Sequence, residues 1–591
     1  MFLRSKKRFK DGKEHRYWSV VESRRGASGK VCQRQVLYLG EINDSQQSAW
    51  CRAIEVFDDC RDEYRPMALF PSDRQAPAMD CDVVQIRLSE LTLHRPRQWG
   101  GCWLTLNLWS QLQFDAFWSS RLPPSRKGTC WLNVLKTLVC YRLIDPGSEW
   151  RLHRQWFKRS AMADLLEDDE RVAQSDTLYR CLDKLVAHKD AMFQFLKGRW
   201  QALFAARYEV LLYDLTSTYF ESNPPGEGLR QYGYSRDKRH DCTQVVIALI
   251  VTPEGLPLTY EVLAGNTADC TTLTDFLARI ERLYGRSERI WVMDRGIPTE
   301  EALAAMRQSA TPVQYLVGTP KGRLTRLEKD FLGKPWTAVR ESVDVKLLNQ
   351  SEELYVLARS HPRMMKERRM RQRRLKRLWQ RLGQLQQAQP SRDQLLIRLG
   401  AAKKDAGRAW SLVKISLPEA DQTVTESTFR FALRKDKLRQ VRRREGRYLL
   451  RSNLTHEDPA QLWRYYIQLT EVEQAFKELK SDLAIRPIYH QTDERIEAHI
   501  FVAFMAYCLQ VTLKQRLKAL APGLTPRAVI EELSGMQMVD VHVPTTDGRQ
   551  LVLSRYTQPE PEQKLLLQRL QLRLPAQPPP RIMGSASART A

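Results

Sequence analysis

Two acidic residues follow apolar runs in a way that suits metal-dependent chemistry. The sequence VLLYD ends on Asp214, and IWVMD ends on Asp294. Both runs are short and rich in β-branched or aromatic residues, so we expect each to be a buried strand that ends on its Asp. Such a strand directs its carboxylate into the crevice where open α/β sheets bind ligands. A single Asp of this kind is most simply a turn residue, but two in one segment favour a site.

A third carboxylate, Glu473, lies in the segment YYIQLTEVEQAFKELKSDL (residues 465–483), which we expect to be one helix. The apolar residues of this segment have the spacing of a buried helix face: Val472, Phe476, Leu479 and Leu483. Glu473 therefore falls at the edge of that face. Tyr466 and Lys480 each lie seven residues from Glu473, about two turns, so the three side chains point in roughly one direction. A Glu–Lys pair on a solvated face is the plainer interpretation, but favoured pairs are three or four residues apart.

Three carboxylates from two strands and a helix are the ligands that a divalent cation prefers. Mg²⁺ takes hard oxygen donors and completes its shell with water and substrate phosphates, and Mn²⁺ can substitute for it. Two such ions, about 3.5–4 Å apart, stabilise the attacking and leaving oxygens of a phosphodiester displacement. Because three clustered carboxylates repel one another, bound cations would relieve that repulsion. Asp214, Asp294 and Glu473 therefore predict a metal site that acts on nucleic acid.

The charge of the chain agrees with a polyanionic partner. The 591 residues include 94 Lys and Arg against 69 Asp and Glu, a formal net charge of +25. This excess is typical of proteins that bind DNA or RNA. A basic ribosomal or structural protein is the competing interpretation, but such chains are usually shorter and less apolar than the 42% found here.

The sequence lacks the motifs of several other classes of protein. The basic start MFLRSKKRFKDGKEHR is followed by no apolar core, and no run of about 18 apolar residues occurs, so neither a secretory signal nor a membrane span is expected. The 11 cysteines form no C-x-x-C pair and the 10 histidines no H-E-x-x-H spacing. Neither G-x-x-x-x-G-K-[ST] nor G-x-S-x-G occurs. We expect a cytoplasmic protein without a disulfide framework, a zinc site or a nucleotide site.

The elements that must position the three carboxylates belong to a mixed α/β layer, because strands and helices alternate after residue 206. We expect six segments: 1–80, a basic β-rich unit; 81–205, mainly helical and DNA-binding; 206–320, the first part of the α/β core; 321–455, a basic insertion of helix plus β-strands; 456–520, the second part of the core; and 521–591, a C-terminal region with a disordered tail.

The order and spacing of Asp214, Asp294 and Glu473 resemble the DD-E triad of bacterial insertion-sequence transposases. The intervals are 80 and 179 residues, and the long second interval resembles the subgroup with a β-rich insertion before the Glu. That subgroup carries Tyr, two residues, Arg, three residues, Glu, six residues, Lys. Tyr466, Glu473 and Lys480 match, whereas Leu469 stands in place of the Arg. Supporting similarities are GYSRDKRHDCTQ (233–244), LAGNTAD (263–269), DRG (294–296) and RPIYHQTDERIEAHIFVAFMAY (486–507).

The resemblance implies a ribonuclease-H-like catalytic core that is interrupted by a mainly β insertion. It also implies that Asp214, Asp294 and Glu473 hold Mg²⁺ and that Tyr466 and Lys480 flank Glu473 to hold the DNA end. With Leu469 in the signature, Lys477 or Arg464 could make the phosphate contact of the missing Arg. The remaining candidate DNA contacts are Arg236, Lys238 and Arg295.

We therefore expect a transposase that binds the terminal inverted repeats of its element, pairs two ends as a homodimer, and cuts and joins DNA at the nucleoid. Two alternatives stay open. The same core could belong to a metal-dependent, structure-selective nuclease that cuts without strand transfer. The chain could instead be an inactive relative that only binds DNA. Metal-dependent cutting separates the last from the other two, and strand joining separates the first two.

Overall fold

The computed structural model of the chain contains two compact units. One joins residues 1–184 to residues 509–591, and the other runs from residue 185 to residue 508. The boundaries of the six expected segments stay a prediction. The described residues are 2–10, 13–25, 31–41, 53–58, 63–68, 86–126, 128–222, 228–268, 273–285, 289–294, 297–309, 312–319, 321–350, 352–419, 422–546 and 548–583.

The N-terminal part of the first unit is a five-stranded sheet with the order β3-β2-β1-β4-β5. Its strands are β1 (Phe2–Lys10), β2 (Lys13–Arg25), β3 (Val31–Glu41), β4 (Ala53–Asp58) and β5 (Glu63–Ala68). β2 and β3 pair antiparallel up to Arg25 and Val31. The strands that are expected in this segment are therefore present, and its boundaries stay a prediction.

Helices make up most of the remainder of this unit. The longer ones are α2 (Gly100–Gln111), α4 (Trp131–Ile144), α8 (Ser175–Leu182), α19 (Pro526–Ser534) and α20 (Pro561–Arg569). α2 packs against α4 and α19. Apolar side chains cover much of its surface, which is consistent with a helix at the centre of a bundle.

A four-stranded sheet completes the unit, in the order β20-β19-β18-β6. Its strands are β6 (Thr92–Gln98), β18 (Gln537–Pro544), β19 (Gln550–Tyr556) and β20 (Arg581–Met583). The buried Arg97 of β6 donates two hydrogen bonds of 2.9 Å to Asp540 of β18. The expected disorder of the C-terminal tail is wrong for β20, which pairs with β19. Residues 584–591 lie outside the described part of the chain.

The second unit contains a nine-stranded sheet with the order β12-β13-β14-β17-β11-β10-β7-β8-β9. Its first five strands in the chain are β7 (Val210–Tyr219), β8 (Gln244–Val251), β9 (Pro257–Ala264), β10 (Ile290–Met293) and β11 (Gln314–Gly318). β7, β8 and β9 are antiparallel, and β10 and β11 run parallel to β7. This order and direction are those of a ribonuclease-H-like core, so the expected α/β fold class is confirmed.

Both faces of these central strands are buried, because helices pack on each side. All eight residues of β8 are buried. Tyr213 of β7 meets Phe276 of α10 (Leu273–Tyr284), with ring centroids 5.2 Å apart. α17 (Leu469–Ser481) packs against β7 and β8. α9 (Lys189–Phe204) packs against β9.

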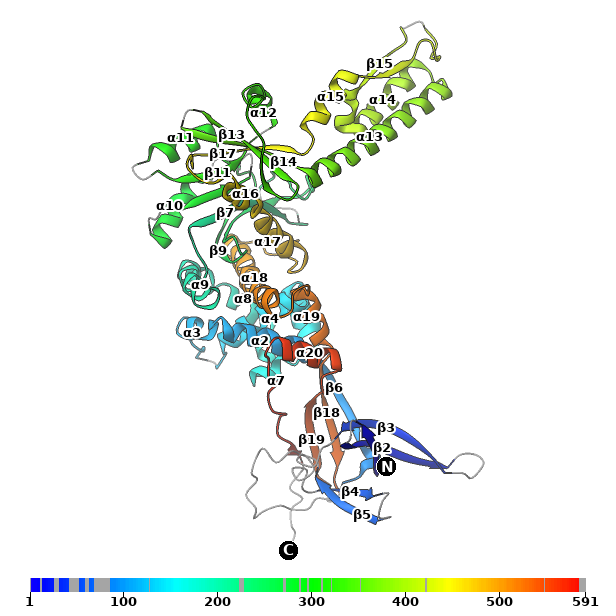
Figure 1. Ribbon diagram of the computed structural model, residues 1–591. Coiled ribbons are helices and arrows are strands. Elements are labelled where there is room, and N and C mark those ends of the chain that lie inside the picture. The colour runs from blue at the N-terminus through cyan, green and yellow to red at the C-terminus, as the bar shows by residue number, and fades with distance from the viewer. Residues whose placement is uncertain are drawn as a thin grey trace. The chain divides into compact units, whose positions relative to one another are not determined.

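The insertion extends the core sheet. β17 (Arg447–Ser452) pairs with β11, and β14 (Glu353–Ser360), β13 (Val343–Gln350) and β12 (Thr337–Arg340) follow. Beyond β14, the helices α13 (His361–Ala388) and α14 (Arg392–Ala406) form a hairpin that extends away from the sheet (Figure 1). They share a buried core with the small sheet of β15 (Val413–Ser416) and β16 (Arg430–Leu433). The expected strands are present, but the longest elements of the insertion are helices.

One described helix, α18 (Asp493–Leu520), is long and apolar enough to cross a membrane by length and composition. Its most apolar window has a mean hydropathy of 1.6, yet 94% of that window is buried inside the protein. Burial of this kind is typical of the core helix of a globular unit.

Candidate active site

The register of two parallel strands brings Asp214 and Asp294 to the same level of the sheet. Met293, the last residue of β10, pairs with Tyr213 of β7, so the two Asp residues that follow are neighbours. The expectation that both strands end at Asp is correct for Asp294 and wrong for Asp214. β7 continues to Tyr219, because its other edge goes on pairing with β8.

The alternation of side chains along β7 directs the carboxylate of Asp214 toward α17. Tyr213 contacts α10 on one face, so the next residue points to the opposite face, against which α17 packs. The carboxylate of Asp214 also accepts a hydrogen bond of 2.8 Å from the backbone N–H of Leu215. The strand geometry thus places Asp214 on the side of the sheet that carries Glu473.

The expected single helix over residues 465–483 is two helices in the structure. α16 (Pro459–Ile467) ends at Gln468, and α17 begins at Leu469. The predicted apolar face of α17 is confirmed, because its members are at most 6% exposed: Val472, Phe476, Leu479 and Leu483. Glu473 lies beside this face and is accessible to solvent.

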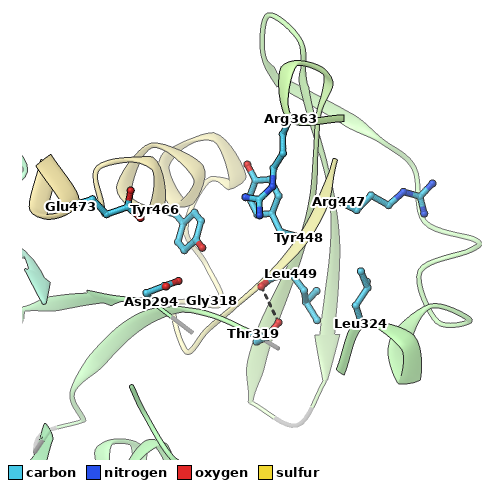
Figure 2. A pocket seen from close by; sticks show the side chains of 10 residues that line it. All are labelled: Asp294, Gly318, Thr319, Leu324, Arg363, Arg447, Tyr448, Leu449, Tyr466 and Glu473. Atoms are coloured by element: carbon cyan, nitrogen blue, oxygen red, sulfur yellow. Dashed lines mark hydrogen bonds between the residues drawn. The ribbon is translucent and has the colours of Figure 1, made fainter. Parts of the chain in front are cut away.

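A cavity of about 200 Å³ opens between the sheet, α16, α17 and the insertion. Asp294, Glu473 and Tyr466 are among its lining residues, whereas Asp214 and Lys480 are not. The other lining residues are Gly318, Thr319, Leu324, Arg363, Arg447, Tyr448 and Leu449. Figure 2 shows the side chains of Asp294 and Glu473 on the same side of the cavity, with Tyr466 beside them.

The carboxylates influence one another's ionisation. Burial, with the negative charges of Asp294 and Glu473, raises the pKa of Asp214 to about 7, against the opposing effects of the Leu215 N–H and Arg236. Burial and the charge of Asp294 also raise the pKa of Glu473. A bound cation would favour the ionised form of Asp214 and Glu473 and so oppose the rise in their pKa.

The donor set fits a divalent cation. Asp214, Asp294 and Glu473 offer hard oxygen ligands, the type that Mg²⁺, Mn²⁺ and Ca²⁺ bind, and no thiolate or imidazole lines the cavity.

Lys480 pairs with Asp237 and not with Glu473, the residue to which its spacing in the sequence pointed. Its ammonium donates a hydrogen bond of 2.9 Å to Asp237, in the loop between β7 and β8, and Arg486 pairs with the same carboxylate oxygen. Burial lowers the pKa of Lys480, against the opposing effect of Asp237. The interpretation of Lys480 as the partner of Glu473 on a solvated face is therefore wrong.

Tyr466 belongs to an aromatic cluster at the wall of the cavity. Its ring centroid lies 5.9 Å from that of Tyr448 and 6.2 Å from that of Trp463, and the latter two are 5.0 Å apart. Trp463 is only 4% exposed, as expected of a core residue. The cluster joins α16 to β17 of the insertion, and so it fixes Tyr466 near Glu473.

The other described candidates for DNA contacts do not line the cavity. Lys477, Arg464 and Lys238 are exposed. The backbone N–H of Arg236 donates a hydrogen bond of 3.1 Å to Ser217 of β7, and its charge reaches Asp214. Arg295 lies outside the described residues.

Two residues that line the cavity carry no local signal of their role in the sequence. Arg363 lies in the first turn of the basic helix α13, and Tyr448 lies in β17, both within the insertion. They reach the cavity because β17 adds to the core sheet beside β11, a pairing that joins segments more than 130 residues apart. Local patterns cannot reveal such a pairing.

Comparison with known proteins places the chain in a family. The model of the transposase DDE domain matches residues 205–509, slightly more than half of the chain, and the N-terminal domain of the IS1634 family of transposases matches residues 3–55. No curated protein matches. Among solved structures, a cryo-EM structure of the piggyBac transposase synaptic complex with hairpin DNA is 10% identical, with 73% of this chain and 79% of that chain covered and a TM-score of 0.36, too low for an argument. The chain belongs to the family of transposases with a DDE domain.

Proposed function

We propose that the protein is a cut-and-paste DNA transposase that binds the terminal inverted repeats of its own element. The observation that carries the proposal is the placement of Asp294 and Glu473 at one cavity of a ribonuclease-H-like core, with Asp214 beside Asp294 on the neighbouring strand and its pKa raised to about 7 by burial and by these two charges. The match to the transposase DDE domain supports it. The excess of basic residues supports DNA as the partner.

In this proposal the three carboxylates hold Mg²⁺, or Mn²⁺ in its place. The ion supplies charge stabilisation for the phosphodiester and lowers the pKa of a bound water. Asp214 must lose its proton to act as a ligand, and its raised pKa makes that loss coincide with metal binding near neutral pH. Protein groups contribute little acid–base chemistry; positioning and charge neutralisation contribute most.

The DNA would be held around the cavity by the side chains that surround it. Tyr466 packs at the wall, and Lys480 would contact a phosphate of the DNA end after leaving Asp237. The exposed Lys477 and Lys238, with Arg236 and Arg295, would contact the backbone nearby without reading sequence. Pairing of two ends implies a homodimer on DNA.

An excision assay tests the proposal. A plasmid that carries the native flanks of this gene is incubated with purified protein and Mg²⁺, beside Glu473→Gln and the control Glu494→Gln, whose carboxylate is exposed and lies outside the cavity. We expect paired cuts at inverted repeats, and joined products, with wild type and Glu494→Gln but not with Glu473→Gln.

The same assay separates the alternatives. Cuts without any joined product would identify a nuclease in place of a transposase. DNA binding without cuts in Mg²⁺ or Mn²⁺ would identify a protein that only binds DNA. Asp214→Asn and Asp294→Asn should each abolish cutting and preserve end binding, and a loss of fold in all three carboxylate variants would make these residues structural.

A further inference from the structure

One basic side chain of the cavity has no role in the chemistry above. Arg363, in the first turn of α13, lines the cavity with Asp294 and Glu473 (Figure 2). Its guanidinium carbon lies 4.9 Å from the ring centroid of Tyr448. Its ion pair with Glu367 is long, at 3.5 Å, and its side chain is 45% exposed. The guanidinium is thus held beside the acidic pair and is open to a ligand.

The ligand that suits this position is a phosphate. A guanidinium beside carboxylates repels metal ions, but it attracts the phosphate that those ions would act on, and its planar fork matches phosphate oxygens. The second arginine of the cavity is placed differently. The guanidinium of Arg447 lies over Trp336, 5.5 Å from its ring centroid, and Figure 2 shows it directed away from Asp294 and Glu473.

α13 continues from Arg363 with a stripe of exposed basic residues. The members are three or four residues apart and lie on one face of the helix: Lys366, Arg369, Arg373 and Lys376. The other face buries Leu378, Leu382 and Leu385 in the core of the helical hairpin. Within the described residues, no ion pair or side-chain hydrogen bond neutralises these four cations. A plain solvated face would usually alternate charges, whereas this stripe leaves like charges side by side.

The length of the stripe suits a nucleic-acid strand. The helix rises ~20 Å from Arg363 to Lys376 at about 1.5 Å per residue. About six phosphates of one duplex strand span the same distance, since each advances the axis by ~3.4 Å. The stripe begins at the cavity that holds Glu473, so a strand bound along it starts at the site of cutting.

We propose that α13 is the track along which the cleaved DNA strand leaves the cavity, with Arg363 on the phosphate next to the cleaved bond and the stripe on the phosphates beyond it. The inference rests on the proposed function and adds the surface that orients the DNA. Arg363 thereby provides, from the insertion, the arginine that Leu469 removes from the signature helix. The partner is the sugar–phosphate backbone, so the contacts position the strand and carry no sequence preference.

The stripe is tested by binding alone. Lys366, Arg369, Arg373 and Lys376 are changed together to Gln in the Glu473→Gln protein, and affinity for a duplex that ends in the inverted repeat is measured against salt in EDTA. The matched control removes four exposed cations from the adjacent part of the same hairpin: Arg398, Lys403, Lys404 and Arg408, each changed to Gln. A plot of log affinity against log salt concentration has a negative slope. We expect the magnitude of this slope to decrease by about 3–4 in the stripe variant and by less than about 1 in the control. Equal changes in both variants, or none in the stripe variant, would overturn the proposal.

Arg363 is tested by the rate of cutting. Arg363→Gln should slow single-turnover cleavage about 10–100-fold, with duplex affinity nearly unchanged and with partial recovery in Arg363→Lys. DNA that carries a neutral methylphosphonate next to the cleaved bond should slow wild type to the rate of Arg363→Gln and leave Arg363→Gln itself unaffected. Additive losses would show that Arg363 does not contact that phosphate. If the wild-type protein never cuts DNA, the proposed function is refuted. The binding test of the stripe does not depend on cleavage, so its result is still informative in that case.

Discussion

Lys480 of α17 and Asp237, in the loop between β7 and β8, form an ion pair of 2.9 Å. Their side chains are only 12% and 11% exposed, and Arg486 pairs with the same carboxylate oxygen. The charges of Lys480 and Arg486 lower the pKa of Asp237, although burial acts in the other direction. The carboxylate therefore occupies the position that a DNA phosphate would take beside Lys480 in the proposed complex.

Lys480→Ala is expected to slow cleavage more than it weakens binding to an ordinary duplex. The ammonium lies at one position near the DNA end, whereas overall affinity depends on many cations spread over the protein. Single-turnover cleavage and equilibrium binding should be measured on the same DNA. Lys518→Ala, which removes an exposed cation of α18 that does not line the cavity, is the control. Equal losses of rate and affinity in Lys480→Ala would remove its proposed role at the end.

Asp237→Asn is expected to lower the free energy of unfolding by about 2 kcal/mol, because two largely buried cations lose their shared counter-ion. The same change should raise affinity for DNA ends, since Lys480 no longer has to leave a carboxylate. Urea unfolding and end binding measure the two effects. Asp241→Asn is the control: Asp241, in the same loop, forms its ion pair with Arg239 at the surface, so the change should leave the free energy of unfolding nearly unaltered. If Asp237→Asn were as stable as wild type, the ion pair would not contribute to the stability of the fold.

The pH dependence of stability should reveal the raised pKa of Asp214. Its folded pKa of about 7 exceeds the ordinary value of 3.8, so the folded state binds the proton more tightly than the unfolded state does. The stability that this proton provides is complete below pH ~4 and is lost as the pH rises to about 7. Asp214→Asn keeps position 214 neutral, and so it should be more stable than wild type at pH 8 but similar to it at pH ~4, in thermal unfolding without metal.

Asp540 is a control because its pKa is shifted in the opposite direction from that of Asp214. Arg97 and Ser554 lower the pKa of Asp540 below its ordinary value, despite burial. Asp540→Asn should therefore be less stable than wild type at pH 8, with the deficit lost as the pH falls below the usual range of an Asp. If Asp214→Asn followed Asp540→Asn, the carboxylates of the proposed site would not repel one another.

Much of the core could be predicted from local sequence, because each element carries its own pattern. The apolar runs that become β7, β8 and β10 are buried strands, and the stripe on α17 is its buried face. Local patterns do not predict where a strand ends when pairing with a neighbouring strand sets that end. Asp214 was expected at a strand end, but β8 pairs with the residues beyond it and extends the strand.

The candidate site could be predicted only in part, for a related reason. Asp294 and Glu473 bear charges in apolar surroundings, and such residues stand out in a sequence. Arg363 and Tyr448 are ordinary members of a basic insertion, and they reach the cavity only through the long-range pairing of β17 with β11 and β14. Asp237, the partner of Lys480, could not be predicted from the sequence. It lies in a loop, where no helical or strand periodicity indicates which way a side chain points.

Leu469→Arg, which restores the signature of the resembled subgroup, is expected to destabilise the protein without improving cleavage. Leu469 begins α17 and is only 7% exposed, so an arginine there would bury a cation or force the helix away from the sheet. The expected loss is about 2–4 kcal/mol in urea unfolding, against less than ~1.5 kcal/mol for Leu469→Met, which preserves volume and polarity. Single-turnover cleavage by the folded fraction should not exceed that of wild type, since Arg363 already places a guanidinium at the cavity. Faster cleavage by Leu469→Arg would mean that the signature position still faces the DNA and that the insertion has not replaced it.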